Sequence, residues 1–290
     1  MNPKVTVVIP AYNAAKYIAT SISSVLEQTL TDWELIVVND GSKDNTAEVV
    51  KGYLSDKRIK LIEQANSGVS AARNTGIKAA TGKFIALLDA DDSYLSDNLE
   101  NKFNVLNGND TVDFVYSDIW KCDKDLKPLY IQKGVPSENL LEEVLLWERE
   151  TIPGFSSNIT MKTSSIKEKF LFDVNLSNCA DRYLKILLAK NLQGVYIPKA
   201  LSNYRDTPSA MSKQVALLDH DEKYIIKKIK ENNLVPSNLS ESKVIANIYF
   251  TLSGSWYRIA HKPLKAIVLA LKAIAIYPPF LFRLFRKLPY

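Results

Sequence analysis

Short runs of apolar, often β-branched residues alternate with segments of helical period through the first part of the chain. This alternation is typical of parallel strands joined by crossover helices. Strands are predicted at residues 5–9, 34–39, 59–63, 84–89 and 113–117, and helices around residues 18–26, after Asn45, and over residues 70–80. The pattern therefore predicts an α/β fold whose open, mostly parallel sheet is covered by helices on both faces.

The pattern is less regular after residue 118 and becomes purely helical after Gln214. The irregular part predicts helices at residues 138–149 and 180–191 and a short strand at 195–197, and the last part predicts helices at residues 217–232, 243–261 and 264–276. We therefore divide the chain into residues 1–118, residues 119–213, which continue the same sheet, and a C-terminal helical region of residues 214–290.

The composition is that of a globular protein, with 46% apolar and 24% charged residues. Two cysteines, Cys122 and Cys179, exclude a disulfide-rich scaffold and favour a reducing compartment. Two histidines, His220 and His261, exclude a His-rich zinc site. The N-terminus shows no signal peptide, and no window has the roughly 18 uninterrupted apolar residues of a membrane span, so we expect a cytoplasmic protein.

The positive charge is concentrated at the C-terminal end. From Ser255 onward there are seven lysines and arginines and no acidic residue, so the net charge of +5 leaves 5 − 7 = −2 for the preceding part. A uniformly basic nucleic-acid-binding protein would not have this distribution, and we expect no nucleic-acid partner.

Three of the predicted strands end in polar or acidic residues. The first ends at Pro10–Asn13, the second at Asn39–Ser42 and the fourth at Asp89–Asp92. Ligands of open α/β sheets bind outside the carboxyl ends of the strands, so these residues are expected to form one site. Asp89 and Asp91 are two residues apart in an extended segment and therefore project to the same side, where they favour Mg²⁺ or a similar divalent cation. The alternative is that they only begin the next helix.

Glycine-rich phosphate-binding loops are absent. The ten glycines form no G-x-G-x-x-G sequence, and the segment Gly76–Phe84 has neither the spacing nor the Ser or Thr of a P-loop. This pattern argues against a dinucleotide-dependent dehydrogenase and a P-loop nucleotidase. A nucleotide whose diphosphate is held by a metal ion remains.

Four motifs in this order and spacing resemble glycosyltransferase family 2, whose fold is of the GT-A type. They are Val7-Val8-Ile9-Pro10-Ala11-Tyr12-Asn13, Val38-Asn39-Asp40-Gly41-Ser42-Lys43-Asp44, Asn66-Ser67-Gly68-Val69-Ser70-Ala71-Ala72-Arg73-Asn74 and Leu88-Asp89-Ala90-Asp91-Asp92. The resemblance implies that residues 1–118 bind a nucleotide sugar and that residues 119–213 bind the acceptor and carry the catalytic base.

The resemblance also assigns the donor-binding residues. It places Pro10 and Tyr12 in the nucleotide pocket and Arg73 near the base and diphosphate. It further implies that Asp89 contacts the ribose or sugar and that Asp91 holds Mg²⁺ or Mn²⁺ on the diphosphate. Asp40 is implied to accept a hydrogen bond from the pyrimidine N3–H, and because uracil and thymine have that N–H while cytosine does not, the donor is expected to be UDP-linked, with dTDP as the alternative.

The catalytic base implied by the resemblance is Asp181. The family usually has a Glu-Asp pair at this place, but here Ala180 stands in the position of the glutamate. A structural alternative is that Asp181 is a first-turn acid favoured by the helix dipole. Downstream, Arg205 matches a family position beside the active site, where it either steadies the diphosphate or only pairs with an acid.

The C-terminal region combines apolar and basic residues. Leu264, Ile267, Val268 and Leu271 share one predicted helical face, while Lys265 and Lys272 lie on another. Such a helix favours an anionic membrane surface, which would place the protein on the inner face of the cell membrane. The alternative is a helix packed on the catalytic domain with a solvated basic face.

The sequence thus predicts a metal-dependent, inverting glycosyltransferase that moves a sugar from a UDP-sugar to a hydroxyl of a glycan or lipid-linked glycan, in cell-surface polysaccharide synthesis. Two alternatives stay open. One is a catalytically silent nucleotide-sugar-binding protein, suggested by Ala180. The other is a sugar-1-phosphate nucleotidyltransferase, which shares this type of sheet but needs a glycine-rich and basic loop after the first strand.

Overall fold

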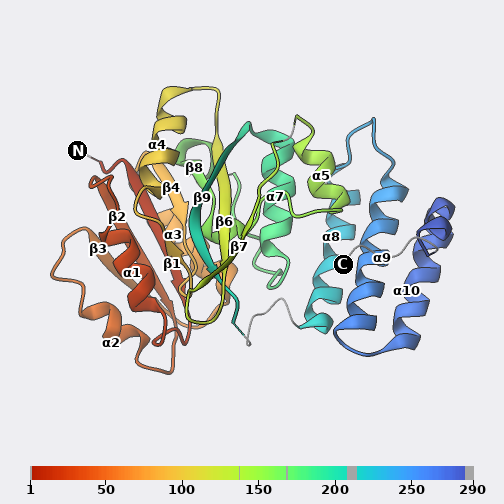
Figure 1. The fold of residues 1–290 in the computed structure, drawn as a ribbon, viewed down its shortest axis with the longest axis horizontal. Coiled ribbons are helices and arrows are strands. Elements are labelled where there is room, and N and C mark those ends of the chain that lie inside the picture. Colours follow the sequence, from red (N-terminus) through yellow and green to blue (C-terminus); the bar gives the residue numbers. More distant parts are fainter. Residues whose placement is uncertain (1, 137, 168, 208–213, 285–290) are drawn as a thin grey trace. The chain divides into compact units, whose positions relative to one another are not determined.

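The structure is a computed structural model that describes residues 2–136, 138–167, 169–207 and 214–284. Its chain contacts divide it into two compact units (Figure 1). The first consists of Met1–Pro136 and Glu150–Pro208, and the second of Ser137–Arg149 and Ser209–Tyr290. The division by function into residues 1–118 and 119–213 stays a prediction.

The N-terminal half of the first unit has the predicted parallel strands. The strands are β1 (Val5–Ala11), β2 (Trp33–Asp40), β3 (Ile59–Gln64) and β4 (Phe84–Leu87), in the spatial order β3-β2-β1-β4. All three pairings among them are parallel. The helices α1 (Ile18–Leu26), α2 (Thr46–Lys51) and α3 (Val69–Ala79) connect them. The predicted fold class is therefore confirmed here.

The other half of the sheet is mixed. Its strands are β5 (Ser93–Tyr94), β6 (Phe114–Cys122), β7 (Pro128–Gln132), β8 (Thr160–Lys162) and β9 (Gly194–Arg205), and its helices are α4 (Asn98–Gly108), α6 (Thr163–Ile166) and α7 (Ala180–Asn191). Strand β8 lies antiparallel between β4 and β6, whereas β9 runs parallel to β6.

Two strand predictions need correction in this half. The strand expected at residues 195–197 is the start of the 12-residue β9, which continues through exposed Pro198 and Lys199 and shifts register against β6. These irregularities interrupt the apolar pattern. The strand expected at residues 84–89 ends at Leu87, and Asp92 N–H donates to the Asp89 carbonyl at 3.1 Å. The segment after β4 is therefore a turn, and the extended alternation expected for Asp89 and Asp91 does not apply.

The core of the first unit lies on both sides of β1 and β2, whose residues are buried along their whole length. On one side, α1 buries Ile18, Ile22 and Val25. On the other, α3 approaches β1 so closely that a Cβ atom at Gly76 would lie 2.2 Å from a methyl group of Val8. Glycine is therefore required at this crossing, and burial on both faces explains the uninterrupted apolar runs.

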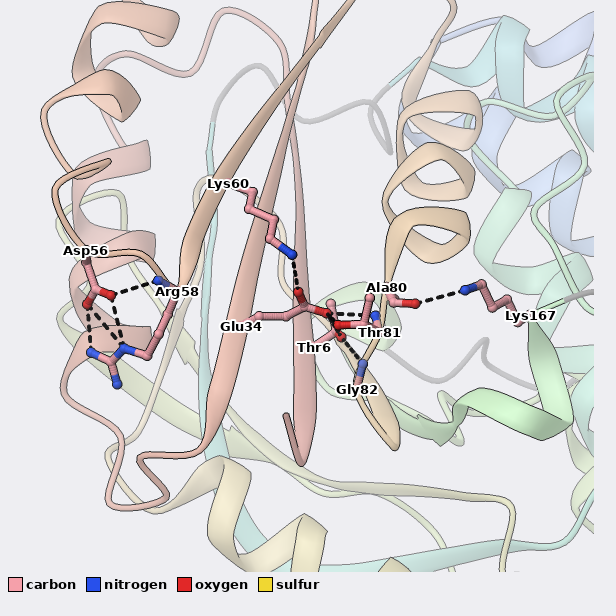
Figure 2. Close-up of polar contacts among 9 residues, drawn as sticks. All are labelled: Thr6, Glu34, Asp56, Arg58, Lys60, Ala80, Thr81, Gly82 and Lys167. Atoms are coloured by element: carbon pink, nitrogen blue, oxygen red, sulfur yellow. Dashed lines mark hydrogen bonds and ion pairs between the residues drawn. The ribbon is translucent and has the colours of Figure 1, made fainter. Parts of the chain in front are cut away.

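A buried carboxylate ties the amino-terminal ends of the strands together (Figure 2). Glu34 on β2 accepts hydrogen bonds from Thr6 of β1, from Lys60 of β3 at 2.8 Å, and from the backbone and side chain of Thr81 before β4. Burial alone would raise the pKa of Glu34, but the hydrogen bonds from Lys60, Thr6 and Thr81 outweigh it and lower the pKa to about 2.

The second unit is helical. It contains α5 (Leu140–Leu146), α8 (Val215–Glu231), α9 (Glu241–Arg258), α10 (Pro263–Ile276) and a 3-10 turn at Pro278–Leu284. Ser240 caps α9 by accepting a hydrogen bond from Lys243 N–H, and Pro263 occupies the first turn of α10. The helices predicted over residues 217–232, 243–261 and 264–276 are confirmed to within a few residues. In the part of the chain that is described, no helix is long and apolar enough to span a bilayer.

We expect Glu34→Gln to lower the free energy of unfolding by about 2 kcal/mol at pH 7, because a charged acceptor in several hydrogen bonds is lost. A carboxyl group with a lowered pKa stabilises the fold above its unfolded pKa, near 4.5, and this contribution disappears as the pH falls towards 2. The difference between wild type and variant, measured by urea denaturation, should therefore shrink between pH 5 and about pH 2.5. The matched change Glu27→Gln, at an exposed position, should have almost no effect. An equal loss for Glu34→Gln at both pH values would contradict this assignment.

Candidate active site

The loops that follow β1 and β2 are locked together. Asn13 has a left-handed backbone with φ of +49°, and its N–H donates to Ser42 Oγ at 3.0 Å while its side-chain oxygen accepts from Lys43 N–H at 2.8 Å. Of the predicted pocket residues, Pro10 is buried in β1, whereas the side chain of Tyr12 is 48% exposed. The structure thus places Tyr12 where a ligand can reach it, at the carboxyl edge of the sheet.

Asp40 ends β2 and is only 3% exposed. Its carboxylate accepts hydrogen bonds from Gln64 at 2.7 Å and from the backbone N–H groups of Ser67 and Gly68 at 2.9 and 2.8 Å. Gly68 has a φ of +89° and directly precedes α3, so the loop before that helix is shaped around the carboxylate. A carboxylate has about four lone-pair positions, so these three donors leave acceptor capacity for one further donor.

The turn after β4 carries three carboxylates, which we call the acidic loop (Asp89–Asp92). Burial, and then the neighbouring charge of Asp89, raise the pKa of Asp91 to about 6. Asp92 is 1% exposed, and burial followed by the charges of Asp91 and Asp89 raises its pKa well above the usual value. The acidic loop therefore gathers carboxylates whose negative charge is only partly offset by nearby arginines.

Arg73 on α3 connects the acidic loop to the predicted catalytic base. Its guanidinium donates to Asp89 at 2.7 Å and to Asp181 at 2.9 Å, and it lies 4.9 Å from the ring centroid of Phe172. The residue is only 5% exposed. Burial alone would lower the pKa of Arg73, but the charges of Asp89 and Asp181 raise it above its ordinary value. The structure thus brings three predicted site residues into one ion-paired group.

Asp181 lies in the first turn of α7, next to Ala180, which is 1% exposed. One carboxylate oxygen of Asp181 receives the hydrogen bond from Arg73, and the other receives one from the hydroxyl of Ser156. Its position in the first turn fits the helix-dipole alternative, but these two side-chain donors fix its orientation in addition. The role of Asp181 as a base stays a prediction.

Arg205, at the end of β9, is bound mainly to backbone. Its Nε donates to the carbonyl of Asp91 at 2.6 Å and its Nη1 to the carbonyl of Lys124 at 2.7 Å, and the guanidinium carbon lies 4.7 Å from the ring centroid of Tyr17. The backbone N–H of Arg205 donates to the Asp92 carboxylate at 2.8 Å. Arg205 therefore fixes the acidic loop, and contact with a diphosphate stays a prediction.

Several residues around this group were not found from the sequence. Ser156 and Ser157 belong to a short turn and contact Asp181 and Asp92. Burial, followed by the negative charges of the acidic loop, raises the pKa of Tyr204 above its ordinary value. The ammonium group of Lys121 lies 3.5 Å from the centroid of the Tyr204 ring. Serine and tyrosine occur both on surfaces and, as here, in buried places, so no signal short of the folded arrangement marks these residues.

The acidic loop fits a divalent cation that also binds substrate. In the described ranges, no three His, Cys, Asp or Glu residues are arranged to hold a metal on their own. Mg²⁺ usually binds through one or two carboxylates together with phosphate oxygens and water, so a larger cluster is not needed. Burial and the charge of Asp89 raise the pKa of Asp91, and the charges of Arg205 and Arg73 offset this only in part, so a further cation beside its carboxylate would be favourable. Asp91 is therefore a suitable ligand, whereas Asp89 already pairs with Arg73.

A cavity of about 700 Å³ lies at the opposite edge of the sheet, before β1 and β4. It is lined by residues 2–4, 81–83, 163, 164, 167 and 169. Its lining contains none of the predicted site residues.

The family model for glycosyl transferase family 2 matches residues 6–165. An uncharacterized glycosyltransferase of Rickettsia bellii is 35% identical over 204 residues, which cover 70% of this chain and 29% of that protein. The Escherichia coli UDP-Glc:alpha-D-GlcNAc-diphosphoundecaprenol beta-1,3-glucosyltransferase WfgD is 44% identical over 113 residues, covering 39% of this chain and 44% of the relative. The matched segments thus span less than half the length of these relatives.

Two solved structures show a similar fold. Staphylococcus aureus TarS 1–349 in complex with UDP-GlcNAc has a TM-score of 0.65 at 19% identity, over 93% of this chain and 79% of the other. The mannosyltransferase PcManGT from Pyrobaculum calidifontis, in complex with GDP-Man and Mn²⁺, has a TM-score of 0.60 at 17% identity, over 96% and 76%. These similarities confirm the expected fold.

We expect Arg73→Met to lower the free energy of unfolding by about 3 kcal/mol, because it leaves the carboxylates of Asp89 and Asp181 close together without their shared cation. Arg58→Met is the matched control. Arg58 also pairs with an aspartate, Asp56 at 2.7 Å, and lies 3.8 Å from the centroid of the Trp33 ring, but its side chain is 40% exposed, so its loss should cost about 1 kcal/mol, less than the loss of Arg73. Urea denaturation at pH 7 measures both variants. Equal losses would show that the buried network around Arg73 is no stronger than a surface pair.

Proposed function

Because the chain belongs to glycosyltransferase family 2, we propose that it transfers a sugar from a nucleotide-sugar donor to a hydroxyl group, in a metal-dependent and inverting reaction. The observation that carries this proposal is the ion-paired group in which Arg73 joins Asp89 of the acidic loop to Asp181. Residues predicted to serve the donor and the acceptor thereby lie within one hydrogen-bonded network.

The proposed donor is a UDP-sugar, with a dTDP-sugar as the alternative. Asp40 supports this choice, because its carboxylate retains acceptor capacity and the pyrimidine N3–H of uracil or thymine is a donor. The complex of TarS with UDP-GlcNAc and the UDP-Glc in the name of WfgD agree with it. Tyr12 and Pro10 would line the pocket for the base.

Asp91 would hold Mg²⁺ or Mn²⁺, and Asp89 would contact the ribose or sugar of the donor. When bound, such an ion neutralises the negative charge of a departing diphosphate. The Mn²⁺ in the complex of PcManGT supports this assignment. The protein contributes the position of the ligands, because Arg205 bonds to the Asp91 carbonyl and Arg73 holds the Asp89 carboxylate.

Asp181 would take the proton from the acceptor hydroxyl as the new glycosidic bond forms on the face opposite the departing diphosphate. Its two oxygens are held by Arg73 and Ser156, so the carboxylate is oriented before the acceptor binds. A positioned general base contributes typically 10²- to 10⁴-fold in rate. The alternative is that Ala180, in place of the usual glutamate, makes the protein a binding protein without turnover.

The proposed acceptor is a glycan or lipid-linked glycan at the inner face of the cell membrane. On α10, Leu264, Ile267, Val268 and Leu271 are 80%, 54%, 62% and 60% exposed. The opposite face of α10 is buried through Ala266, Leu269 and Ala273. We call the exposed set the α10 apolar row; an exposed row of this kind is suited to a membrane interface. The undecaprenol in the name of WfgD agrees with a lipid-linked acceptor.

The charges beside this row differ from the expected picture. Lys265 forms an ion pair with Asp219 at 3.1 Å and lies 3.6 Å from the Trp256 ring, and Lys272 lies 4.2 Å from the Tyr249 ring. Both lysines therefore interact with other residues of the helical unit. Two of the seven lysines and arginines that follow Ser255, Arg286 and Lys287, lie outside the described residues. The proposed attraction to the membrane is therefore supported by the α10 apolar row, with the exposed Arg258 and Lys262 near the start of α10 as further basic groups.

We expect Asp181→Asn to lower the rate of UDP release by 10²- to 10⁴-fold, since the positioned base is lost. Asp91→Ala should abolish the stimulation of that rate by Mn²⁺. UDP release is measured with UDP-Glc, UDP-GlcNAc and UDP-Gal in turn, with water as the acceptor. The exposed Asp110→Ala is the control and should keep the wild-type rate.

Unchanged rates for both Asp91→Ala and Asp181→Asn would contradict the proposed mechanism. If the protein binds UDP tightly but neither releases UDP from any UDP-sugar nor transfers a sugar to any hydroxyl acceptor, the result would instead support the binding protein suggested by Ala180. Formation of pyrophosphate from UTP and a sugar phosphate would favour the nucleotidyltransferase.

We expect the double variant Ile267→Ser/Leu271→Ser to bind vesicles of phosphatidylglycerol and phosphatidylcholine at least about tenfold more weakly, because it removes apolar surface from the α10 apolar row. Its UDP affinity should not change. The double variant Leu129→Ser/Tyr130→Ser alters exposed residues of β7, in the other unit, and is the control. Sedimentation with vesicles measures binding, and equal binding by all three proteins would refute the role of α10.

A further inference from the structure

A short turn lies between the two parts of the proposed site. The 3-10 turn Phe155–Ser157 carries two adjacent serines, which are 3% and 1% exposed. The hydroxyl of Ser156 donates to the Asp181 carboxylate. The hydroxyl of Ser157 donates to the Asp92 carboxylate and accepts a hydrogen bond from Asp89 N–H at 3.0 Å. Each hydroxyl thus contacts a different part of the site.

The backbone of the turn explains this divergence. A 3-10 helix has three residues per turn, so neighbouring side chains leave its axis about 120° apart. Gly154, which precedes the turn, has a φ of +53°, and a Cβ atom there would lie 3.0 Å from side-chain atoms of Ile119 and Tyr204. A glycine is therefore needed to begin the turn at this position.

The turn is also anchored from the core. Asn158, which is fully buried, donates from its amide to the carbonyls of Ser117 at 2.6 Å and Pro153 at 2.9 Å, and its side-chain oxygen accepts from Ser117 N–H. Lys102 of α4 is likewise buried and donates to the Asn158 carbonyl at 2.6 Å. Burial lowers the pKa of Lys102 to about 7, so keeping its ammonium group charged in this position costs free energy. The serines therefore project from a rigid base.

We propose that Ser156 and Ser157 are positioning residues with separate duties: Ser156 orients Asp181 towards the acceptor, and Ser157 fixes the acidic loop for the donor diphosphate. This inference rests on the proposed function. It adds that the turn Phe155–Ser157 fixes the position of Asp181 relative to the acidic loop.

The contacts distinguish the two duties. Ser156 contacts the site only through Asp181 among the described side-chain hydrogen bonds, so its loss should affect the chemical step rather than donor binding. Ser157 bonds to both Asp92 and the Asp89 backbone, so its loss should release the acidic loop and weaken binding of the metal–nucleotide complex. Loss of an orienting partner typically costs 10- to 100-fold in activity or metal affinity.

The matched control is Ser165. Its hydroxyl donates to the Asp113 carboxylate at 2.7 Å, which is the same kind of contact outside the site. Ser165→Ala should reproduce any general cost of losing a serine–carboxylate hydrogen bond. Thermal unfolding of all variants shows whether each one folds, and Ser156→Thr retains a hydroxyl and should recover activity.

The experiment measures two quantities for each variant: the rate of UDP release at saturating concentration of the UDP-sugar that the wild type hydrolyses fastest, and the Kd for UDP with Mn²⁺ by calorimetry. We expect Ser156→Ala to lower the rate about 10- to 100-fold with Kd unchanged within twofold, and Ser157→Ala to raise Kd about tenfold or more. Ser165→Ala should change neither. Identical effects of the two serine variants on both quantities would overturn the division of duties.

A second measurement tests whether Ser156 acts through Asp181. In an Asp181→Asn background, Ser156→Ala should lower the residual rate no further, because residues that act as one unit are not additive. Multiplying losses would overturn the inference. A wild type that neither releases UDP nor transfers a sugar to any hydroxyl acceptor, or an Asp181→Asn variant as active as wild type, would overturn the proposed function and this inference with it. An active wild type, an impaired Asp181→Asn variant and a fully active Ser156→Ala variant would overturn the inference alone.

Discussion

The buried guanidinium of Arg73 is the interaction on which the rest of the site depends. It joins Asp89, which follows β4, to Asp181 at the start of α7, so it connects the parallel half of the sheet to the mixed half. A buried cation without partners, or two neighbouring carboxylates without a cation, would each be costly. Since both carboxylates share one cation, the geometry of the site and the packing of the two halves of the first unit are coupled.

Much of the parallel half could be predicted from the sequence. Apolar runs with intervening helices indicate parallel strands, and parallel strands have their carboxyl ends at the same edge of the sheet. The sequence therefore predicts that Asp40 and Asp89 lie at one site, although it shows no contact between their segments. Arg73 was placed only through the family resemblance, because helix periodicity shows that a residue lies on α3 but not which carboxylates it will meet.

The mixed half could not be predicted to the same extent. Strand β8 has three residues and lies antiparallel between strands from two distant segments, so its sequence has no room for a periodic pattern. The turn that carries Ser156 and Ser157 precedes this strand and has no sequence signature of its own. The resemblance found Arg205 but not its function in the fold, because hydrogen bonds to the carbonyls of Asp91 and Lys124 depend on the conformation of two loops.

Alanine at position 180 affects which groups orient Asp181 and how much negative charge surrounds it. In the pattern that this segment resembles, two consecutive acids begin the helix, whereas here the first position is a buried methyl group. Arg73 already serves two carboxylates, so a glutamate at position 180 would add negative charge beside Asp181 without adding a cation. With alanine there, Asp181 keeps one charged donor and one hydroxyl donor, which leaves lone-pair capacity for a proton. Arg73 and Ser156 are therefore the groups that orient Asp181, and in the proposed mechanism the turn that holds Ser156 would belong to the catalytic arrangement.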